Sequence, residues 1–280
     1  MEYINYNGKI IEGRKAGINI SNRGFKYGDG LFETMKSKNG AIFFIDDHFD
    51  RLLMGMDLLH FKIPVHFSAA VLKKQITALL KKNGHNNLAR IRLTVFRGDG
   101  GLYDQINHSP NYLLETWALP DRTGQWNSNG LVIGIYNEVK KSCDILSNLK
   151  HNNFLSYVMA ALHAKKQKWN DAVVLNSFNR ICDTTIANIF LVKDEKIYTP
   201  SLGEGCIAGV MRKNMIGQLA KNNIQVTECE ISIADIENAD EVFLTNSIYN
   251  LRWVKSIEGR EYSNCYTRQI YSLLPQTISR

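Results

Sequence analysis

The chain has 280 residues, of which 44% are hydrophobic and 22% are charged. This composition is typical of a soluble globular protein, and no apolar run approaches the ~18 residues of a membrane-spanning helix. The segment from Met1 to Asn5 has neither the basic nor the apolar region of a signal peptide. From the length we expect two domains, in a cytoplasmic protein with no membrane partner.

The sequence has 34 lysine and arginine residues against 27 aspartate and glutamate residues, a formal net charge of +7. The basic residues are dispersed, and their densest cluster, Lys165, Lys166 and Lys168, falls on one turn of an expected helix, where charges usually face solvent. We therefore expect no nucleic-acid partner. The five cysteines are odd in number and form no CxxC pair, which argues against a disulfide framework and a zinc site and indicates a reducing compartment.

The Asn-Gly pairs at 7–8 and 39–40 are typical of two-residue β-hairpin turns. The alternating residues around each pair predict two pairs of strands, over 3–6 with 9–11 and over 31–36 with 41–45. Apolar residues at helical spacing then predict two helices and, after them, a strand. These three elements are expected over 52–59, 71–80 and 90–96.

The polar stretch 121–130 is rich in turn-forming residues and lies between apolar segments, so it predicts a linker. We place the domain boundary there: residues 1–120 form a smaller α/β domain and residues 121–280 a larger one. In the larger domain strands and helices are mixed, and the fold class of the whole chain is α/β, or α+β across two domains. Its strands are expected over 131–136, 172–175, 188–192, 197–199 and 241–244, and its helices over 154–162 and 211–221.

Three features of the larger domain together indicate pyridoxal 5′-phosphate (PLP) as the cofactor. Lys150 stands just before a predicted helix and can form an imine with an aldehyde. Asp183 can hold the proton of a pyridinium ring. Gly209, Val210 and Met211 begin a predicted helix, whose free N–H groups and dipole can bind a phosphate.

The motifs occur in one order along nearly the whole chain, and as a set they resemble the class IV aminotransferases, which are PLP enzymes of fold type IV. That family includes branched-chain aminotransferases, D-amino acid aminotransferases and 4-amino-4-deoxychorismate lyases. The resemblance is carried by Arg23-Gly24-x-x-Tyr27-Gly28-Asp29-Gly30-x-Phe32-Glu33, His48-x-x-Arg51-Leu52, Lys150, Asp183-x-x-x-x-Asn188-Ile189-Phe190 and Gly209-x-x-Arg212.

The resemblance implies a role for each matching residue. Lys150 would carry the cofactor and move the substrate's α-proton, and Asp183 would contact the pyridine nitrogen where the family has a glutamate. Arg51 would bind the phosphate with its planar guanidinium. The start of the helix at Gly209, Val210 and Met211 would bind it as well, although Val210-Met211 stands where many relatives have Ile-Thr. Ser247 would add a hydroxyl.

The substrate is less narrowly indicated. Phe32 and Tyr103 suggest an apolar pocket, and Arg97 lies in a motif that resembles the lyases. Leu102-Tyr103-Asp104 stands where D-amino acid aminotransferases have an Arg-x-His pair, which argues against D-amino acids. It also lacks the arginine that the lyases commonly have at the place of Leu102.

The first hypothesis is therefore aminotransfer between a small amino acid, branched-chain or otherwise apolar, and a keto acid. The alternative is 4-amino-4-deoxychorismate lyase, which releases pyruvate and p-aminobenzoate. The family resemblance also implies a homodimer in which the polar loop 98–110 reaches the neighbouring subunit. No metal is expected.

Overall fold

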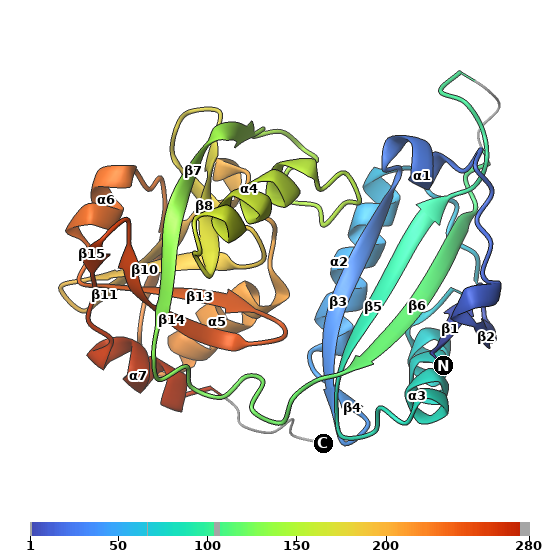
Figure 1. The fold of residues 1–280 in the computed structure, drawn as a ribbon, viewed down its shortest axis with the longest axis horizontal. Coiled ribbons are helices and arrows are strands. Elements are labelled where there is room, and N and C mark those ends of the chain that lie inside the picture. The colour runs from blue at the N-terminus through green and yellow to red at the C-terminus, as the bar shows by residue number, and fades with distance from the viewer. Residues whose placement is uncertain (1, 66, 104–106, 275–280) are drawn as a thin grey trace. The chain divides into compact units, whose positions relative to one another are not determined.

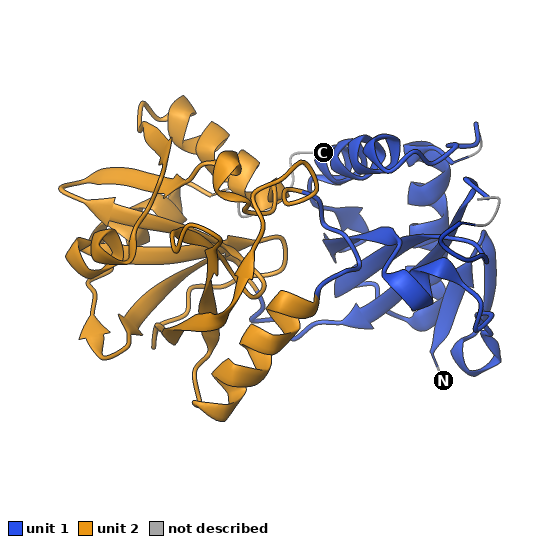
Figure 2. Cartoon of the chain, turned by 90° about the horizontal axis from the view of Figure 1, so that it is seen from above, with its two compact units in different colours: residues 1–123, 149–154 blue, residues 124–148, 155–280 orange. Residues whose placement is uncertain are grey.

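The structure is a computed structural model that describes residues 2–65, 67–103 and 107–274. The chain divides into two compact units, which are coloured separately in Figure 2. Unit 1 is Met1–Thr123 with Leu149–Phe154, and unit 2 is Gly124–Asn148 with Leu155–Arg280. A short segment around Lys150 thus belongs to the fold of unit 1, although the residues on both sides of it belong to unit 2.

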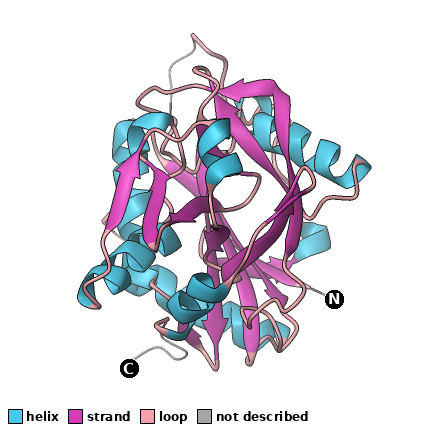
Figure 3. Ribbon diagram, turned by 90° about the vertical axis from the view of Figure 1, so that its left-hand side faces the viewer, coloured by secondary structure: helices cyan, strands magenta, loops and turns pink. Residues whose placement is uncertain are grey.

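Unit 1 is built on a six-stranded antiparallel sheet (Figures 1 and 3). The pairs at 7–8 and 39–40 have the positive φ angles that two-residue hairpin turns require, and they join β1 to β2 and β3 to β4. The strand order is β2-β1-β6-β5-β3-β4. The strands are β1 Tyr3–Tyr6, β2 Lys9–Glu12, β3 Gly30–Lys38, β4 Ala41–Ile42, β5 Leu88–Arg97 and β6 Pro110–Ala118.

Two long helices, α2 (Ile45–Leu58) and α3 (Ala69–Asn83), cover one face of this sheet and form the core of unit 1 with it. The side chain of Ser68 caps α3 at its start, and Gly84 ends the helix in a left-handed conformation. A short helix, α1 (Arg23–Tyr27), precedes β3. The buried side chains that join helices and sheet include Met35, Leu52, Met56, Ile76, Leu79, Ile91 and Leu93.

Unit 2 contains a nine-stranded mixed sheet in the order β12-β11-β10-β13-β14-β7-β8-β9, with β15 beside β14. Its pairs are antiparallel except β11 with β12, β14 with β7 and β7 with β8. The strands are β7 Leu131–Lys141, β8 Asp171–Asn176, β9 Ile181–Thr184, β10 Asn188–Lys193, β11 Lys196–Pro200, β12 Val226–Cys229, β13 Glu241–Asn246, β14 Asn250–Ile257 and β15 Arg260–Glu261.

Helices flank the sheet of unit 2 and bury its apolar side chains (Figure 1). Helix α4 lies against β7 and β8, and α5 lies against β12 and β13. A capping box of Ser232 and Asp235 begins α6. The helices are α4 Leu155–Lys166, α5 Val210–Lys221, α6 Ile233–Asn238 and α7 Cys265–Ser272.

The α/β class and the hairpins at the two Asn-Gly pairs are confirmed, as is the helix that begins at Gly209-Val210-Met211. The expected strand over 41–45 is wrong in its second half, because β4 ends at Ile42 and Ile45 begins α2. Asp46 and Asp47 in the first turn favour a helix start there, since acidic side chains interact well with the positive end of the helix dipole.

Candidate active site

The backbone around Lys150 extends the sheet of unit 1. The N–H of Phe32 donates to the carbonyl of Lys150 over 2.8 Å, and the N–H of Asn152 donates to the carbonyl of Gly30 over 2.8 Å. A Cβ atom on Gly30 would overlap Val95 and Asn152, so only glycine permits this close approach. The segment is thereby fixed to the first residues of β3.

The side chain of Lys150 lies over aromatic rings of the same unit. Its Nζ is 4.6 Å from the ring centroid of Phe32 and 5.5 Å from that of Phe154. The guanidinium of Arg92, on the neighbouring strand β5, lies 3.8 Å from the same Phe32 centroid. The predicted cofactor lysine and an arginine therefore both lie over the Phe32 ring, whose π-face is negative and attracts cations.

Arg92 belongs to a polar face of the sheet that the sequence analysis missed. In the register of β3 with β5, Phe32 pairs with Thr94, Thr34 with Arg92, and Lys36 with Arg90. Burial lowers the pKa of Lys36 to about 8, with Lys38 adding to the effect, and burial also lowers the pKa of Arg92. The signal was present in β5, where Arg90, Arg92 and Thr94 alternate with fully buried apolar residues.

On the opposite face of β3, Glu33 holds two residues of α2. Arg51 donates from Nε to Glu33 Oε1 over 2.8 Å and from Nη2 to Oε2 over 2.5 Å. His48 Nδ1 lies 2.6 Å from Oε2. Burial raises the pKa of Glu33, but the charges of Arg51 and His48 outweigh it and lower the pKa to about 2. Arg51, the predicted phosphate ligand, is thus oriented by a buried carboxylate.

The two other predicted substrate residues, Arg97 and Tyr103, differ in their surroundings. Arg97 is buried and pairs with Asp29, which Arg23 also contacts over 2.8 Å. Arg97 donates in addition to the carbonyl of Leu59. Tyr103 is 100% exposed in unit 1, and the next residue in the sequence, Asp104, lies outside the described residues.

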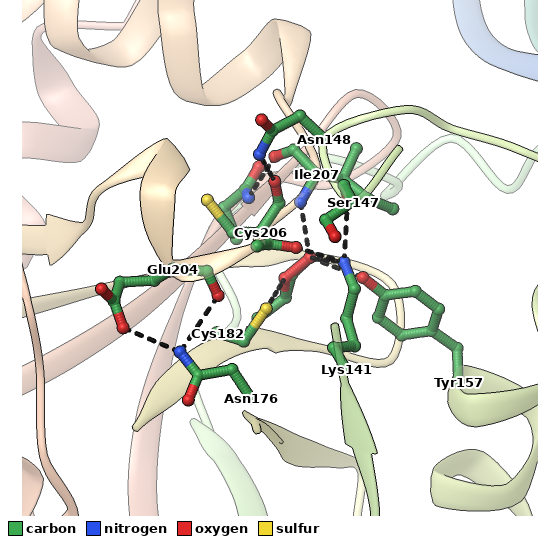
Figure 4. Close-up of polar contacts among 12 residues, drawn as sticks. Lys141, Ser147, Asn148, Tyr157, Asn176, Cys182, Glu204, Cys206 and Ile207 are labelled. Carbon is green, nitrogen blue, oxygen red and sulfur yellow. Dashed lines mark hydrogen bonds and ion pairs between the residues drawn. The ribbon is translucent and has the colours of Figure 1, made fainter. Parts of the chain in front are cut away.

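In unit 2, Asp183 is buried and contacts Lys141, Tyr157, Cys182 and Ile207, which are labelled in Figure 4. Its Oδ2 accepts hydrogen bonds from the Tyr157 hydroxyl over 2.8 Å and from the N–H of Ile207 over 2.9 Å. Lys141 Nζ lies 3.8 Å from the same oxygen. Within the part of the chain that the structure describes, Oδ1 contacts the Sγ of Cys182, a weak donor at 3.8 Å. One carboxylate oxygen is therefore held by the protein, and the other retains hydrogen-bonding capacity.

A single loop links Asp183 to the start of α5. Ile207, which donates to Asp183, also accepts a hydrogen bond on its carbonyl from Asn188 Nδ2 over 2.9 Å. Two residues later, a Cβ atom on Gly209 would overlap Asn188 Oδ1. Asn188 thus requires a glycine at the helix start, so the Asp-x-x-x-x-Asn and Gly-x-x-Arg motifs of this chain meet at one point of the fold.

Helix α5 begins at Val210, and Gly209 provides no side-chain cap. The first N–H groups of an α-helix have no acceptor within the helix, so those of Val210 and Met211 point outward as donors. Nearby in the fold, Thr245 pairs with Asn188 between β13 and β10, and its hydroxyl is buried without a hydrogen-bond partner. Ser247 lies in the turn that follows β13.

One protein-family model matches most of the chain. Residues 30–257 match the family model described as amino-transferase class IV. The chain belongs to the class IV aminotransferase family. It is therefore an enzyme of a family that uses PLP, as its motifs indicated.

Individual relatives of this class IV chain carry both of the expected activities. An aminodeoxychorismate lyase from Vibrio harveyi is 31% identical, over 87% of this chain and 89% of the relative. A putative branched-chain-amino-acid aminotransferase from Methanocaldococcus jannaschii is 27% identical, over 96% of this chain and 93% of the relative. The solved branched-chain aminotransferase of Escherichia coli has the same fold, with a TM-score of 0.83 at 22% identity over 95% of this chain and 91% of that one.

The residues of this class IV enzyme fit PLP in their donor chemistry. Asp183 has an oxygen with spare acceptor capacity for a protonated ring nitrogen, and α5 offers N–H donors for a phosphate. The buried hydroxyl of Thr245 without a partner is a further donor of the kind that a polar ligand satisfies. Among the described helices, none is long and apolar enough to cross a membrane.

Proposed function

We propose that this chain is a PLP-dependent aminotransferase whose cofactor lysine is Lys150. The observation that supports this most directly is the pair of cations on Phe32, with Lys150 Nζ 4.6 Å and the Arg92 guanidinium 3.8 Å from the ring centroid. An α-amino acid has an amine close to a carboxylate. A reactive amine beside an arginine is the arrangement that can receive both groups.

Bound PLP would supply an electron sink for the charge that develops at the substrate's α-carbon. Lys150 Nζ would accept the α-proton and return it. Asp183 Oδ1 would keep a proton on the ring nitrogen, since an ionised carboxylate favours the positively charged form of its partner. Arg51, the N–H groups at Gly209, Val210 and Met211, and the hydroxyl of Ser247 would bind the phosphate.

For the substrate we propose a small branched-chain or other apolar amino acid, or the matching keto acid. Its carboxylate would bind Arg92, and its side chain would lie against Phe32 and Phe154, whose rings meet edge to face at 5.3 Å. Arg97, which was predicted to bind substrate, contacts Asp29, His108 and the carbonyl of Leu59. We propose for it a role in shaping the loop that follows β5.

Trapping the cofactor tests the assignment of Lys150. The purified protein should be yellow, and borohydride should fix the cofactor irreversibly on a lysine. Peptide mapping should find the adduct on Lys150. Lys150→Ala should keep PLP affinity from the phosphate ligands but should not be trapped and should turn over at least 1,000-fold more slowly. An adduct on Lys141, or normal turnover of Lys150→Ala, would refute the assignment.

The carboxylate site is tested separately with Arg92→Gln. Loss of a charged hydrogen-bond partner should raise KM for the amino acid roughly 10- to 100-fold, while binding of PLP stays unchanged. Arg90→Gln, two residues away on the same face, is the matched control. An equal KM effect in both variants would show that overall charge, and not a carboxylate at Arg92, is responsible.

The second candidate is 4-amino-4-deoxychorismate lyase, and the 31% identity to the Vibrio harveyi enzyme favours it. The two reactions differ in one requirement, because aminotransfer needs a keto-acid acceptor and the lyase reaction does not. Steady-state turnover on L-amino acids that depends on added keto acid would support aminotransfer. Pyruvate release from aminodeoxychorismate without an acceptor would support the lyase.

We also propose a homodimer in the cytoplasm. Leu102 and Tyr103 are exposed on loop 98–110 in the single chain, as expected of residues that a neighbouring subunit covers. All five cysteines are free, which is consistent with a reducing compartment. Sedimentation should give twice the chain mass. A monomer that retains full activity on dilution would contradict the dimer.

A further inference from the structure

Lys141 is a buried lysine whose role the sequence did not suggest. It ends β7 and is only 7% exposed. Between Tyr136 and Lys141 the register of β7 with β8 shifts, so that Lys141 pairs with Asn176. Such irregularities commonly redirect a side chain. Here the shift accompanies an ammonium placed inside unit 2, toward the cluster drawn in Figure 4.

The ammonium of Lys141 contacts two backbone carbonyls, an aromatic ring and a carboxylate. It donates to the carbonyl of Ser147 over 3.2 Å and to the carbonyl of Gly205 over 2.5 Å. It lies 4.9 Å from the ring centroid of Tyr157. Its contact with a negative charge is Asp183 Oδ2, at 3.8 Å. Lys141 therefore ties together the segment that leads to Lys150, the loop that leads to α5, and the carboxylate between them.

A buried ammonium is costly unless it is paired, and so is a buried carboxylate. Asp183 is 2% exposed, and among the described residues its other side-chain partners include the Tyr157 hydroxyl and the Cys182 thiol. Burial and the adjacent Asp183 charge raise the pKa of the Tyr157 phenol, and burial raises the pKa of the Cys182 and Cys206 thiols. Lys141 is thus the neighbour whose positive charge favours the ionised form of Asp183.

We propose that Lys141 is a positioning residue that keeps Asp183 ionised and occupies its Oδ2 atom, so that Oδ1 is presented to the ring nitrogen of the cofactor. This inference rests on the proposed function in taking Asp183 as the partner of the ring. It adds that the charge state of the carboxylate is set by unit 2 itself before any cofactor binds.

The physical reason concerns a single proton. A carboxylate and a pyridine nitrogen in contact can share their proton in two ways, as a neutral pair or as an ion pair. A fixed cation at 3.8 Å from the carboxylate stabilises the ion pair, because it acts most strongly on the nearer negative charge. Without Lys141 the proton would move toward Asp183, and the ring would lose its positive charge.

Three substitutions separate charge from hydrogen bonding at this position. Lys141→Gln retains donors for the carbonyls of Ser147 and Gly205 but removes the charge. Lys141→Arg retains the charge, and Lys141→Met removes both the charge and the hydrogen-bond donors. Lys140→Met, at the adjacent position on the same strand, is the matched control for a lost lysine. Each variant is prepared with PLP and, separately, after the cofactor has been removed.

The first measurement needs no cofactor. Carboxyl ¹³C NMR of apoprotein labelled at aspartate should show that Asp183 becomes protonated at a pH at least one unit higher in Lys141→Gln than in the unchanged protein. Lys141→Arg and Lys140→Met should leave that pH unchanged. Equal titration of Asp183 in Lys141→Gln and in the unchanged protein would overturn the proposal, whether or not the protein turns over substrate.

The second measurement is PLP affinity in a double-mutant cycle. Lys141→Gln should weaken PLP binding roughly 10-fold and shift the visible absorbance of the bound cofactor, and it should have no further effect on affinity in an Asp183→Asn background. Additive losses would contradict action through Asp183. If the unchanged protein bound no PLP, the proposed function would fail, while the titration of Asp183 would still decide the role of Lys141.

Discussion

Asp183 shows how an aspartate can occupy a position where the family has a longer glutamate. The N–H of Ile207 and the hydroxyl of Tyr157 both reach Oδ2, so the loop before α5 and helix α4 come to the shorter side chain. The carboxylate is thereby fixed by contacts at one oxygen. Its reach toward a ligand depends on where these two neighbours hold it.

Replacing Asp183 tests its charge at the ring nitrogen. Asp183→Asn should lower turnover roughly 30- to 1,000-fold, because losing a charged partner in a buried site is worth on the order of 2–4 kcal/mol. Asp183→Glu keeps the charge and should retain more activity than the asparagine variant. Steady-state kinetics with the same amino acid decides the matter, and unchanged turnover of Asp183→Asn would remove the residue from the mechanism.

Glu33 is a second buried carboxylate. Its replacement is predicted to lower the stability of the protein and to release Arg51 from its orientation. Glu33→Gln leaves Arg51 and His48 without their anion and should destabilise the protein by about 3 kcal/mol at pH 7. It should also weaken PLP binding, since Arg51 loses its orientation. Urea unfolding and PLP titration measure the two effects. Glu115→Gln, on the other face of the same sheet, is the control and should change neither by more than a small fraction.

The destabilisation by Glu33→Gln should depend on pH in a defined way. The folded pKa of about 2 lies below the ordinary value of 4.5, so the stabilisation by Glu33 is fully present above about pH 4.5 and is lost as the pH falls through 2. The difference in unfolding free energy between the two proteins should therefore be constant from pH 7 to 5 and shrink below that. A difference that stays constant down to pH 2.5 would contradict the ion pairing.

At the scale of elements, the start of α5 depends on two residues, Gly209 at its N-cap and Asn188 at the start of β10. Gly209 has an ordinary φ of −66°, so an alanine there is not strained in its backbone. The obstacle is Asn188 Oδ1, which a Cβ would overlap. Moving Asn188 would break its hydrogen bond to Ile207, and Ile207 in turn holds Asp183.

Gly209→Ala should therefore lower PLP affinity at least 10-fold even though alanine favours helices. Gly217→Ala, in the middle of the same helix, is the matched control, because a Cβ there meets open space. That variant should gain up to about 1 kcal/mol of stability and keep its affinity. Fluorescence titration with PLP and thermal unfolding measure both variants. Equal PLP affinity in the two variants would show that the helix start tolerates a side chain.

The elements that the sequence predicted well are those with local signals. The two Asn-Gly turns specify their hairpins because few residues adopt positive φ, and the apolar spacing of α2 and α3 matches their buried faces. Arg92 and Lys141 were missed for the opposite reason. The alternation in β5 marks Arg92 as a residue of the polar face, but its role depends on cross-strand register, and the role of Lys141 depends on a shift between β7 and β8. Neither the register nor the shift can be read from the local sequence.

At the scale of the whole molecule, unit 1 combines Met1–Thr123 with the later segment Leu149–Phe154, and the predicted domain boundary lies at residue 121. That division depends on a polar linker, which is a local signal, and Thr123 does end the first stretch of unit 1. The return of Leu149–Phe154 to unit 1 rests on hydrogen bonds to Phe32 and Gly30, which are more than one hundred residues away in sequence. Such pairing cannot be recognised from periodicity.

This arrangement predicts that residues 1–123 alone make an incomplete unit. Without the segment around Lys150, the N–H of Phe32 and the carbonyl of Gly30 lose their partners, which should cost about 1–2 kcal/mol. Denaturant unfolding of a fragment 1–123 should show this loss against the same fragment with residues 149–154 joined by a flexible linker. Equal stability of the two fragments would show that the segment adds nothing to the sheet.

The hydrogen bonds between Lys150 and β3 have one more consequence, for reconstitution from pieces. Because the lysine's backbone extends a sheet edge, a synthetic peptide spanning residues 149–154 should be able to bind the 1–123 fragment by strand addition. The reactive amine would then arrive on a molecule separate from the sheet that orients it. The sheet of the fragment and the basicity of the amine could thus be varied independently, because lysine analogues can be introduced by peptide synthesis.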